Sequence, residues 1–157
     1  MDNIPLTLQL KMIADTIYIP GDRESARRAR DMYYQALTSC GPFASDDERA
    51  DAYLCISNAS IELGDLEAAV CATRTGFSCS PNNMLRAILL TNQAGLYSLL
   101  RQHDDAERSA RLACKYARRD GTPTVRDACE ENLTSVRARD TSKFKHIYLR
   151  NKPLPKG

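Results

Sequence analysis

The sequence predicts an all-α protein, a stack of three helical hairpins followed by a C-terminal capping helix and an extended tail. Apolar residues recur every three or four positions along most of the chain, which is the spacing of one helix face. The seven glycines and seven prolines fall mostly where these stripes end. Hydrophobic residues make up 43% and charged residues 27% of the 157 residues, a balance typical of a globular domain. We expect a helical domain over 1–140 and a tail over 141–157.

The first hairpin is expected over residues 5–40. Its first helix, 5–19, is rich in Leu and Ile and ends at Pro20-Gly21. Asp22 then caps a second helix, which Gly41-Pro42 ends. One face of this second helix carries small and apolar residues at helical spacing: Ala26, Ala29, Met32, Tyr33 and Ala36.

The second hairpin, expected over 45–80, has the clearest local signals. Ser45 and Glu48 fit a capping box, in which the Ser and Glu side chains each accept from a free backbone N–H. Gly64-Asp65 separates the two helices, because Gly leaves a helix at little cost and Asp caps the next one. Pro81 stops the second helix. Two small residues on that helix let helix backbones come close: Ala69 and Gly76.

The third hairpin is expected over 83–119. Asn82-Asn83 caps its first helix, and a break near Gln102-His103 ends it. Asp104-Asp105 starts the second helix, where acids favour the positive end of the helix dipole. Thr122-Pro123 then opens a last helix to about residue 138, because Pro suits the first helical position. We expect this helix to cover the end of the stack with one inward stripe: Val125, Cys129, Leu133 and Val136.

The second helices of the three hairpins share one spacing of small and apolar residues. Ala29-Tyr33-Ala36, Ala69-Thr73-Gly76 and Ala106-Ala110-Ala113 align, and their first members lie 40 and 37 residues apart. This pattern resembles the tetratricopeptide repeat, whose period is about 34 residues. The resemblance covers roughly residues 5–119 and implies a right-handed α-α superhelix that acts as a binding scaffold. The middle hairpin matches best, at Tyr53, Ile56, Gly64-Asp65, Ala69, Gly76 and Pro81.

The pentatricopeptide family, whose usual partner is RNA, is the near relative and supplies the alternative function. The pentatricopeptide pattern also fits Tyr53, Gly64 and Ala69, but Pro81 lies earlier in the unit than that pattern places its end. An RNA groove needs positive charge. The expected inner helices offer few cations: Lys11, Arg49 and Arg86.

Some tetratricopeptide domains hold the carboxylate end of a chaperone tail with Lys, Arg and Asn on their first helices. Of the corresponding residues here only Asn58 fits, and the acids Asp51 and Glu62 would repel a carboxylate. We therefore expect this chain not to use such a clamp.

No catalytic pattern is present in the sequence, which has no P-loop, no GxGxxG and no GxSxG. The two histidines, His103 and His146, fall in an expected turn and in the tail, far from metal-ligand spacing. We expect no enzyme, metal, cofactor or small-molecule substrate. The Arg23–Arg30 cluster is expected to be a solvated face with local acidic partners. No apolar run is long enough to span a membrane.

Six cysteines lie at positions 40, 55, 71, 79, 114 and 129, and none forms a CxxC motif. We expect buried, reduced thiols that pack as small apolar residues. The alternative is disulfides between helices, because Cys40/Cys55 and Cys114/Cys129 share one spacing. The N-terminus resembles neither a signal peptide nor a transit peptide, so a reducing intracellular compartment is expected, cytoplasm or mitochondrial matrix, and not secretion.

The tail carries the charge asymmetry of the chain. Residues 1–136 hold 15 Lys and Arg against 19 Asp and Glu, a net charge of −4, whereas residues 137–157 hold seven cations and one acid, for +6. We expect the tail to dock on a neighbouring protein. The alternatives are nucleic-acid contact and folding back over the acidic body. The expected tail contacts are Lys143, Phe144, Lys145, Tyr148, Leu149 and Arg150.

These observations together predict a non-catalytic protein-interaction scaffold, a small accessory subunit or adaptor of a larger complex such as a mitochondrial assembly. The alternative is an RNA-binding, pentatricopeptide-like repeat protein. The second expected contact surface, beside the tail, is the concave face of the first helices, represented by Leu54, Asn58, Thr91 and Gly95.

Overall fold

The computed structural model describes residues 6–19, 21–38, 45–79, 81–140 and 142, with the side chains of 6–8 not described. Within these residues all regular structure is helical, with seven α-helices and no strand, so the predicted all-α class is confirmed. The helices are α1 Leu6–Ile17, α2 Arg23–Thr38, α3 Asp46–Glu62, α4 Leu66–Ser78, α5 Asn83–Leu99, α6 His103–Asp120 and α7 Pro123–Arg137.

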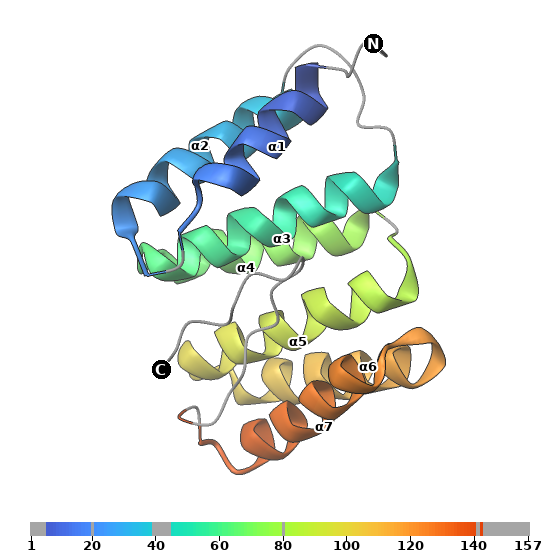
Figure 1. The fold of residues 1–157 in the computed structure, drawn as a ribbon. Coiled ribbons are helices and arrows are strands. Elements are labelled where there is room, and N and C mark those ends of the chain that lie inside the picture. The colour runs from blue at the N-terminus through green and yellow to red at the C-terminus, as the bar shows by residue number, and fades with distance from the viewer. Residues whose placement is uncertain (1–5, 20, 39–44, 80, 141, 143–157) are drawn as a thin grey trace.

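Consecutive helices pair as hairpins and the hairpins lie against one another in chain order (Figure 1). α1 packs on α2, α3 on α4 and α5 on α6, while α2 contacts α3 and α4 contacts α5. α7 packs on both helices of the third hairpin. No described helix is long and apolar enough to cross a bilayer.

Side-chain caps place the starts of four helices where the sequence predicts them. In each case an oxygen of the residue before the helix accepts a hydrogen bond from the backbone N–H three positions on, which satisfies one of the free donors of the first turn. The pairs are Ser45 with Glu48 at 3.2 Å, Asp65 with Ala68 at 3.2 Å, Asn82 with Leu85 at 2.9 Å and Thr122 with Val125 at 3.3 Å.

The turn after α3 has a geometry that recurs twice more in the chain. Gly64 has φ +76°, Arg101 after α5 has φ +60° and Arg139 after α7 has φ +54°. In each turn the next N–H bonds to a carbonyl five residues back: Asp65 to Ser60 at 2.9 Å, Gln102 to Tyr97 at 2.8 Å and Asp140 to Ser135 at 3.0 Å. The three left-handed residues are 37 and 38 positions apart.

The small residues predicted to allow close packing do so. Gly76 lies so near the first helices that a Cβ there would stand 3.1 Å from Tyr53 Cβ and 3.1 Å from a methyl of Leu89. A full row of alanines on α6 is buried in the largest apolar cluster, beneath α5 and α7: Ala106, Ala110, Ala113 and Ala117.

The final helix covers the third hairpin as expected. The predicted stripe of α7, Val125, Cys129, Leu133 and Val136, is buried in the same apolar cluster. Asn132 on this face is fully buried and donates a hydrogen bond to Thr91 Oγ1 of α5 at 3.2 Å. The opposite face of α7 is polar and exposed, as the positions of Arg126, Glu130 and Arg137 show.

Candidate functional site

The residues predicted to form a concave contact face are buried. Leu54 has an exposed fraction of 0%, Thr91 of 1% and Asn58 of 4%, and Gly95 is also buried. Leu54 lies inside the apolar cluster that joins α3 to α5, and Thr91 lies under Asn132 of α7. In the structure these four residues therefore present no open surface for a partner.

The predicted tail contacts, Lys143, Phe144, Lys145, Tyr148, Leu149 and Arg150, lie outside the described residues, as does His146. Among the other expectations, Asp104-Asp105 stands in the first turn of α6. Cys114 and Cys129 are buried free thiols and not a disulfide. Cys40, the partner in the other candidate pair, is outside the described residues.

The arginines of α2 divide into two kinds. Arg27 and Arg28 form local pairs with Glu24, each at 3.4 Å, as the sequence predicts for a solvated face. Arg30, in contrast, reaches the second hairpin, where it contacts Asp65 at 3.4 Å and donates to Ser60 Oγ at 3.3 Å. These longer contacts were not expected from local sequence.

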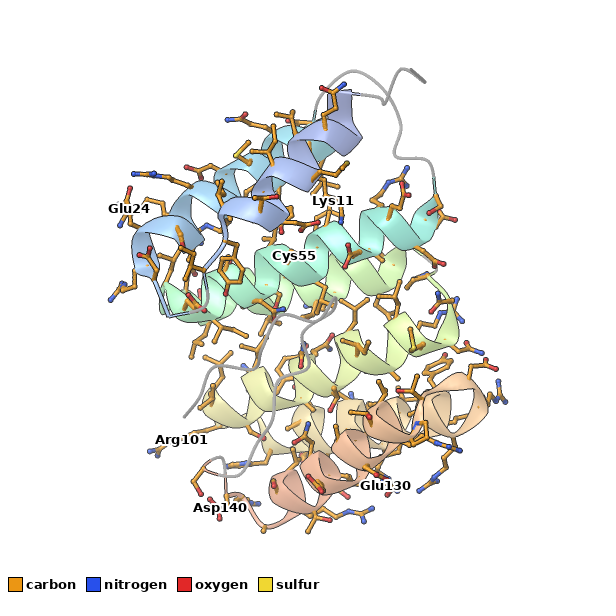
Figure 2. All side chains as sticks on the ribbon, viewed as in Figure 1. Lys11, Glu24, Cys55, Arg101, Glu130 and Asp140 are labelled. Atoms are coloured by element: carbon orange, nitrogen blue, oxygen red, sulfur yellow. The ribbon has the colours of Figure 1, made fainter. Side chains whose placement is uncertain are left out.

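A buried ionic cluster joins the first hairpin to α3. It consists of Lys11, Asp15, Tyr33, Asp51 and Cys55. Lys11 Nζ lies 2.5 Å from Asp51 Oδ2 and 3.3 Å from Asp15 Oδ2, and the Lys11 side chain is only 1% exposed. Tyr33 donates its hydroxyl hydrogen bond to Asp15. Figure 2 shows Lys11 and Cys55 at the junction of α1 with α3.

Burial and neighbouring charges together set the pKa values in this cluster. Burial alone would lower the pKa of Lys11, but the carboxylates of Asp51 and Asp15 outweigh it and hold that pKa above its ordinary value. Burial, with the nearby carboxylates, raises the pKa of the Cys55 thiol to about 12 and also raises the pKa of Tyr33. Cys55 is therefore protonated at neutral pH and a poor nucleophile. The arrangement suits a structural contact between hairpins.

A second polar contact fixes the other end of the same interface. Tyr18 donates to Glu62 Oε1 at 2.7 Å, and the Gly21 N–H donates to the same oxygen at 2.9 Å. Asp51 and Glu62, the two acids that argue against a carboxylate clamp, thus both hold the first hairpin on α3.

An open groove runs between α4 and α6, with α5 as its floor. It consists of two adjoining hollows of about 280 and 620 Å³ that share four lining residues. The shared residues are Arg74, Tyr97, Asp105 and Arg108. The smaller hollow is completed by Phe77, Leu90, Gln93, Ser109 and Leu112, and the larger by Glu67, Val70, Cys71, Leu100 and Gln102. We call this surface the α4–α6 groove.

The charges in the α4–α6 groove are unevenly compensated. Arg108 pairs with Asp105 on its own helix at 3.3 Å. Arg74, across the groove on α4, is exposed, and no ion pair joins it to any residue that the structure describes. Gln93 on the floor donates to Ser109 Oγ at 3.4 Å. Glu67, which lines only the larger hollow, is likewise exposed and pairs with no described cation. The groove therefore has an unpaired cation, Arg74, beside the apolar smaller hollow and an unpaired acid at its other end.

An aromatic contact lies beside the smaller hollow, which Phe77 lines. The guanidinium of Arg86 lies 5.9 Å from the ring centre of Phe77 on α4 and 5.6 Å from that of Tyr116 on α6. The two rings meet edge to face at 6.2 Å. Such cation–π and aromatic contacts hold α4, α5 and α6 at a fixed separation here. No sequence motif pointed to this arrangement, because its members come from three helices.

Within the described part of the chain, no group of three or more His, Cys, Asp or Glu side chains is placed to hold a metal ion. No protein-family model, no curated protein and no solved structure matches the chain. The resemblance to the tetratricopeptide repeat therefore stays a prediction from the residues of this chain.

Proposed function

We propose that this protein is a non-catalytic interaction scaffold made of tetratricopeptide-like hairpins, and that it serves as a small adaptor or accessory subunit of a larger complex. One observation carries the proposal: the α4–α6 groove, an open surface formed jointly by the second helices of two successive hairpins. Stacked hairpins leave such surfaces between units, and repeat proteins bind their partners along them.

The recurring turn supports the repeat interpretation. The left-handed residues at 64, 101 and 139 stand at nearly equal intervals, as expected when one structural unit is repeated along the chain. The same backbone hydrogen bond forms in each turn, and the helices that precede the three turns, α3, α5 and α7, contact one another in order.

The residue types in the groove also support a protein partner. Protein interfaces are enriched in Tyr, Phe and Arg and contain apolar anchors surrounded by polar groups. The groove combines Tyr97, Phe77, Arg74 and the half-exposed Leu112 in one continuous surface.

A site-directed crosslinking experiment tests the scaffold function. A photoreactive phenylalanine analogue is placed at Leu112 in the groove of the full-length protein, and at Thr134 on the exposed face of α7 as the matched control. We expect irradiation in native extract to join a defined protein to position 112 and not to position 134. If neither position yields a defined protein, the proposal is wrong.

The same samples address RNA as the alternative partner. Crosslinked or co-purified RNA that ribonuclease removes, with recovery falling steeply as salt rises, would replace the scaffold by a pentatricopeptide-like function. A comparison of the full-length chain with its 1–140 truncation shows whether the basic tail contributes to either interaction.

A further inference from the structure

We propose that the α4–α6 groove binds a partner segment in which a carboxylate lies next to a large apolar side chain, with the carboxylate on Arg74 and the apolar side chain between Tyr97 and Leu112. This inference rests on the proposed scaffold function and specifies the chemistry of its partner.

Arg74 is the cation that selects the carboxylate. Asp105 already neutralises Arg108 at 3.3 Å, whereas no described acid pairs with Arg74. A guanidinium presents several N–H donors in a plane that matches the two oxygens of a carboxylate. Arg74 is exposed in the free protein, but a segment seated in the groove would cover the new ion pair, and a covered pair is screened less by water than one on an open surface.

The apolar position lies on the side of the smaller hollow. Leu112 is 38% exposed although it lies in a concavity, and Leu90 forms an apolar floor beside Tyr97. Covering Leu112 and Tyr97 removes apolar surface from water, which is favourable by about 25 cal/mol for each Å² buried.

The larger hollow gives the site a direction. Glu67 lines that end of the groove and does not line the smaller hollow. A second carboxylate placed there would meet like charge, whereas a neutral or basic residue would not. The partner segment should therefore read, along the groove, as apolar, then acidic, then neutral or basic.

The helices on either side of the groove, α4 and α6, are held in place in the free protein. The Phe77–Arg86–Tyr116 contact ties α4 to α6 beside the smaller hollow, and Gln93 bonds to Ser109 across the α5–α6 contact. A surface that is already ordered loses little conformational entropy on binding.

Charge makes the basic tail of this chain a poor match for the Arg74 end of the groove. Residues 137–157 carry a net charge of +6, so the tail would bring cations to Arg74. An acidic segment of another protein is the complementary choice.

The test uses the full-length protein and three matched arrays of short synthetic peptides. Every peptide contains one fixed Leu, followed at varied spacing by Glu in the first array, Gln in the second and Lys in the third. A peptide copying residues 141–157 is added. Binding is measured by fluorescence anisotropy, and the contacted residues are located by amide chemical shifts of isotope-labelled protein.

We expect the Glu array to bind about tenfold more tightly than the Gln array, the effect of one charge-assisted contact. Amide shifts should concentrate at Arg74, Tyr97 and Leu112. Arg74→Glu should abolish the preference for Glu and create one for Lys, while Arg111→Glu, an exposed change on α6 outside the groove, should leave it unchanged.

Three results would overturn the carboxylate proposal: equal or tighter binding of the Gln or Lys arrays or of the tail peptide, equal losses in both charge variants, or no binding by any array. The crosslinking experiment is independent of these peptides. A defined protein joined at position 112 with no preference for Glu would leave the scaffold function standing and remove only the carboxylate.

Discussion

The two ends of the hairpin stack differ in the polar contacts that they add to apolar packing. The first hairpin meets α3 through the buried ionic cluster around Lys11 and through Glu62, which accepts from Tyr18 and Gly21. The third hairpin and α7 meet through alanine, leucine and valine side chains in one apolar cluster. Alanines of α2 also pack on Ile56 and Ala59 of α3, so apolar packing is common to both ends and the buried ion pair sets the first end apart.

This difference predicts which substitutions destabilise each interface. A buried ion pair adds little stability over an apolar pair, but breaking it leaves one charge buried without compensation. An apolar interface lined by alanines tolerates loss of any single polar contact, but it has no room for larger side chains. At the first end, removing one charge of the buried pair should therefore lower stability most. At the second end, enlarging a buried alanine should lower it most.

Lys11→Met should have the largest effect, because Asp51 and Asp15 then remain buried without their cation. We expect the free energy of unfolding to fall by about 3–5 kcal/mol, measured by urea denaturation. Lys11→Met combined with Asp51→Leu should recover much of this loss, since both charges are then removed. Arg27→Met, which breaks an exposed pair with Glu24, is the control and should cost less than about 1 kcal/mol. A Lys11→Met loss as small as the control would contradict the ionic role.

Ala113→Leu should have the next largest effect, at the apolar end. Ala113 is fully buried between α6 and its neighbours, so the added side chain must displace packed atoms. We expect a loss of about 1–3 kcal/mol. Hydrogen exchange should quicken in α5, α6 and α7 and stay unchanged in α1 and α2. Leu112→Ala, on the half-exposed face of the same helix, serves as the control, and uniform acceleration along the chain would argue against two separate interfaces.

Alkaline pH should weaken the ionic end. Cys55 has its pKa raised from 9.0 to about 12 in the folded chain, and Lys11 is raised as well. The folded state then keeps protons that the unfolded chain releases, so stability is full below pH 9 and falls as pH rises toward 12. For Cys55 the fall is about 1.4 kcal/mol per pH unit.

Cys55→Ala should reduce this alkaline slope, measured as urea midpoints at a series of pH values. Cys71→Ala, at an exposed thiol, is the matched control and should leave the slope unchanged. Cys129, at the apolar end, also has its pKa raised to about 12 by burial, so Cys129→Ala should reduce the slope too. A profile that is flat above pH 9 in the parent protein would contradict these protonation states.

The recurring turn provides the smallest and most closely matched test. Gly64 and Arg101 share a left-handed backbone, which costs a residue with a side chain about 1 kcal/mol more than Gly. Arg101→Gly should therefore stabilise the chain by up to about 1 kcal/mol, and Gly64→Ala should destabilise it by about as much. Thermal unfolding of each variant measures its change in stability relative to the parent protein. Changes of the same sign would show that the two turns are not equivalent.

Much of the fold was determined by the sequence alone. The helix boundaries follow from caps such as Ser45, Asp65 and Asn82, which act within three residues of their own position. The close approach at Gly76 and the inward face of α7 follow from small or apolar residues at helical spacing. Such local interactions depend only on neighbours in the chain, so a pattern of residue types is enough to predict them.

The sites, in contrast, were decided by the tertiary structure. The pair Lys11–Asp15 at i, i+4 is visible in sequence, but the contact with Asp51 depends on how the first hairpin lies on α3. The burial of Leu54 and Thr91 depends in the same way on the stacking of separate hairpins. So does the placing of Arg74, Tyr97 and Arg108 around one groove. Small differences in the angle between hairpins change which distant side chains meet, and helical periodicity does not specify that angle.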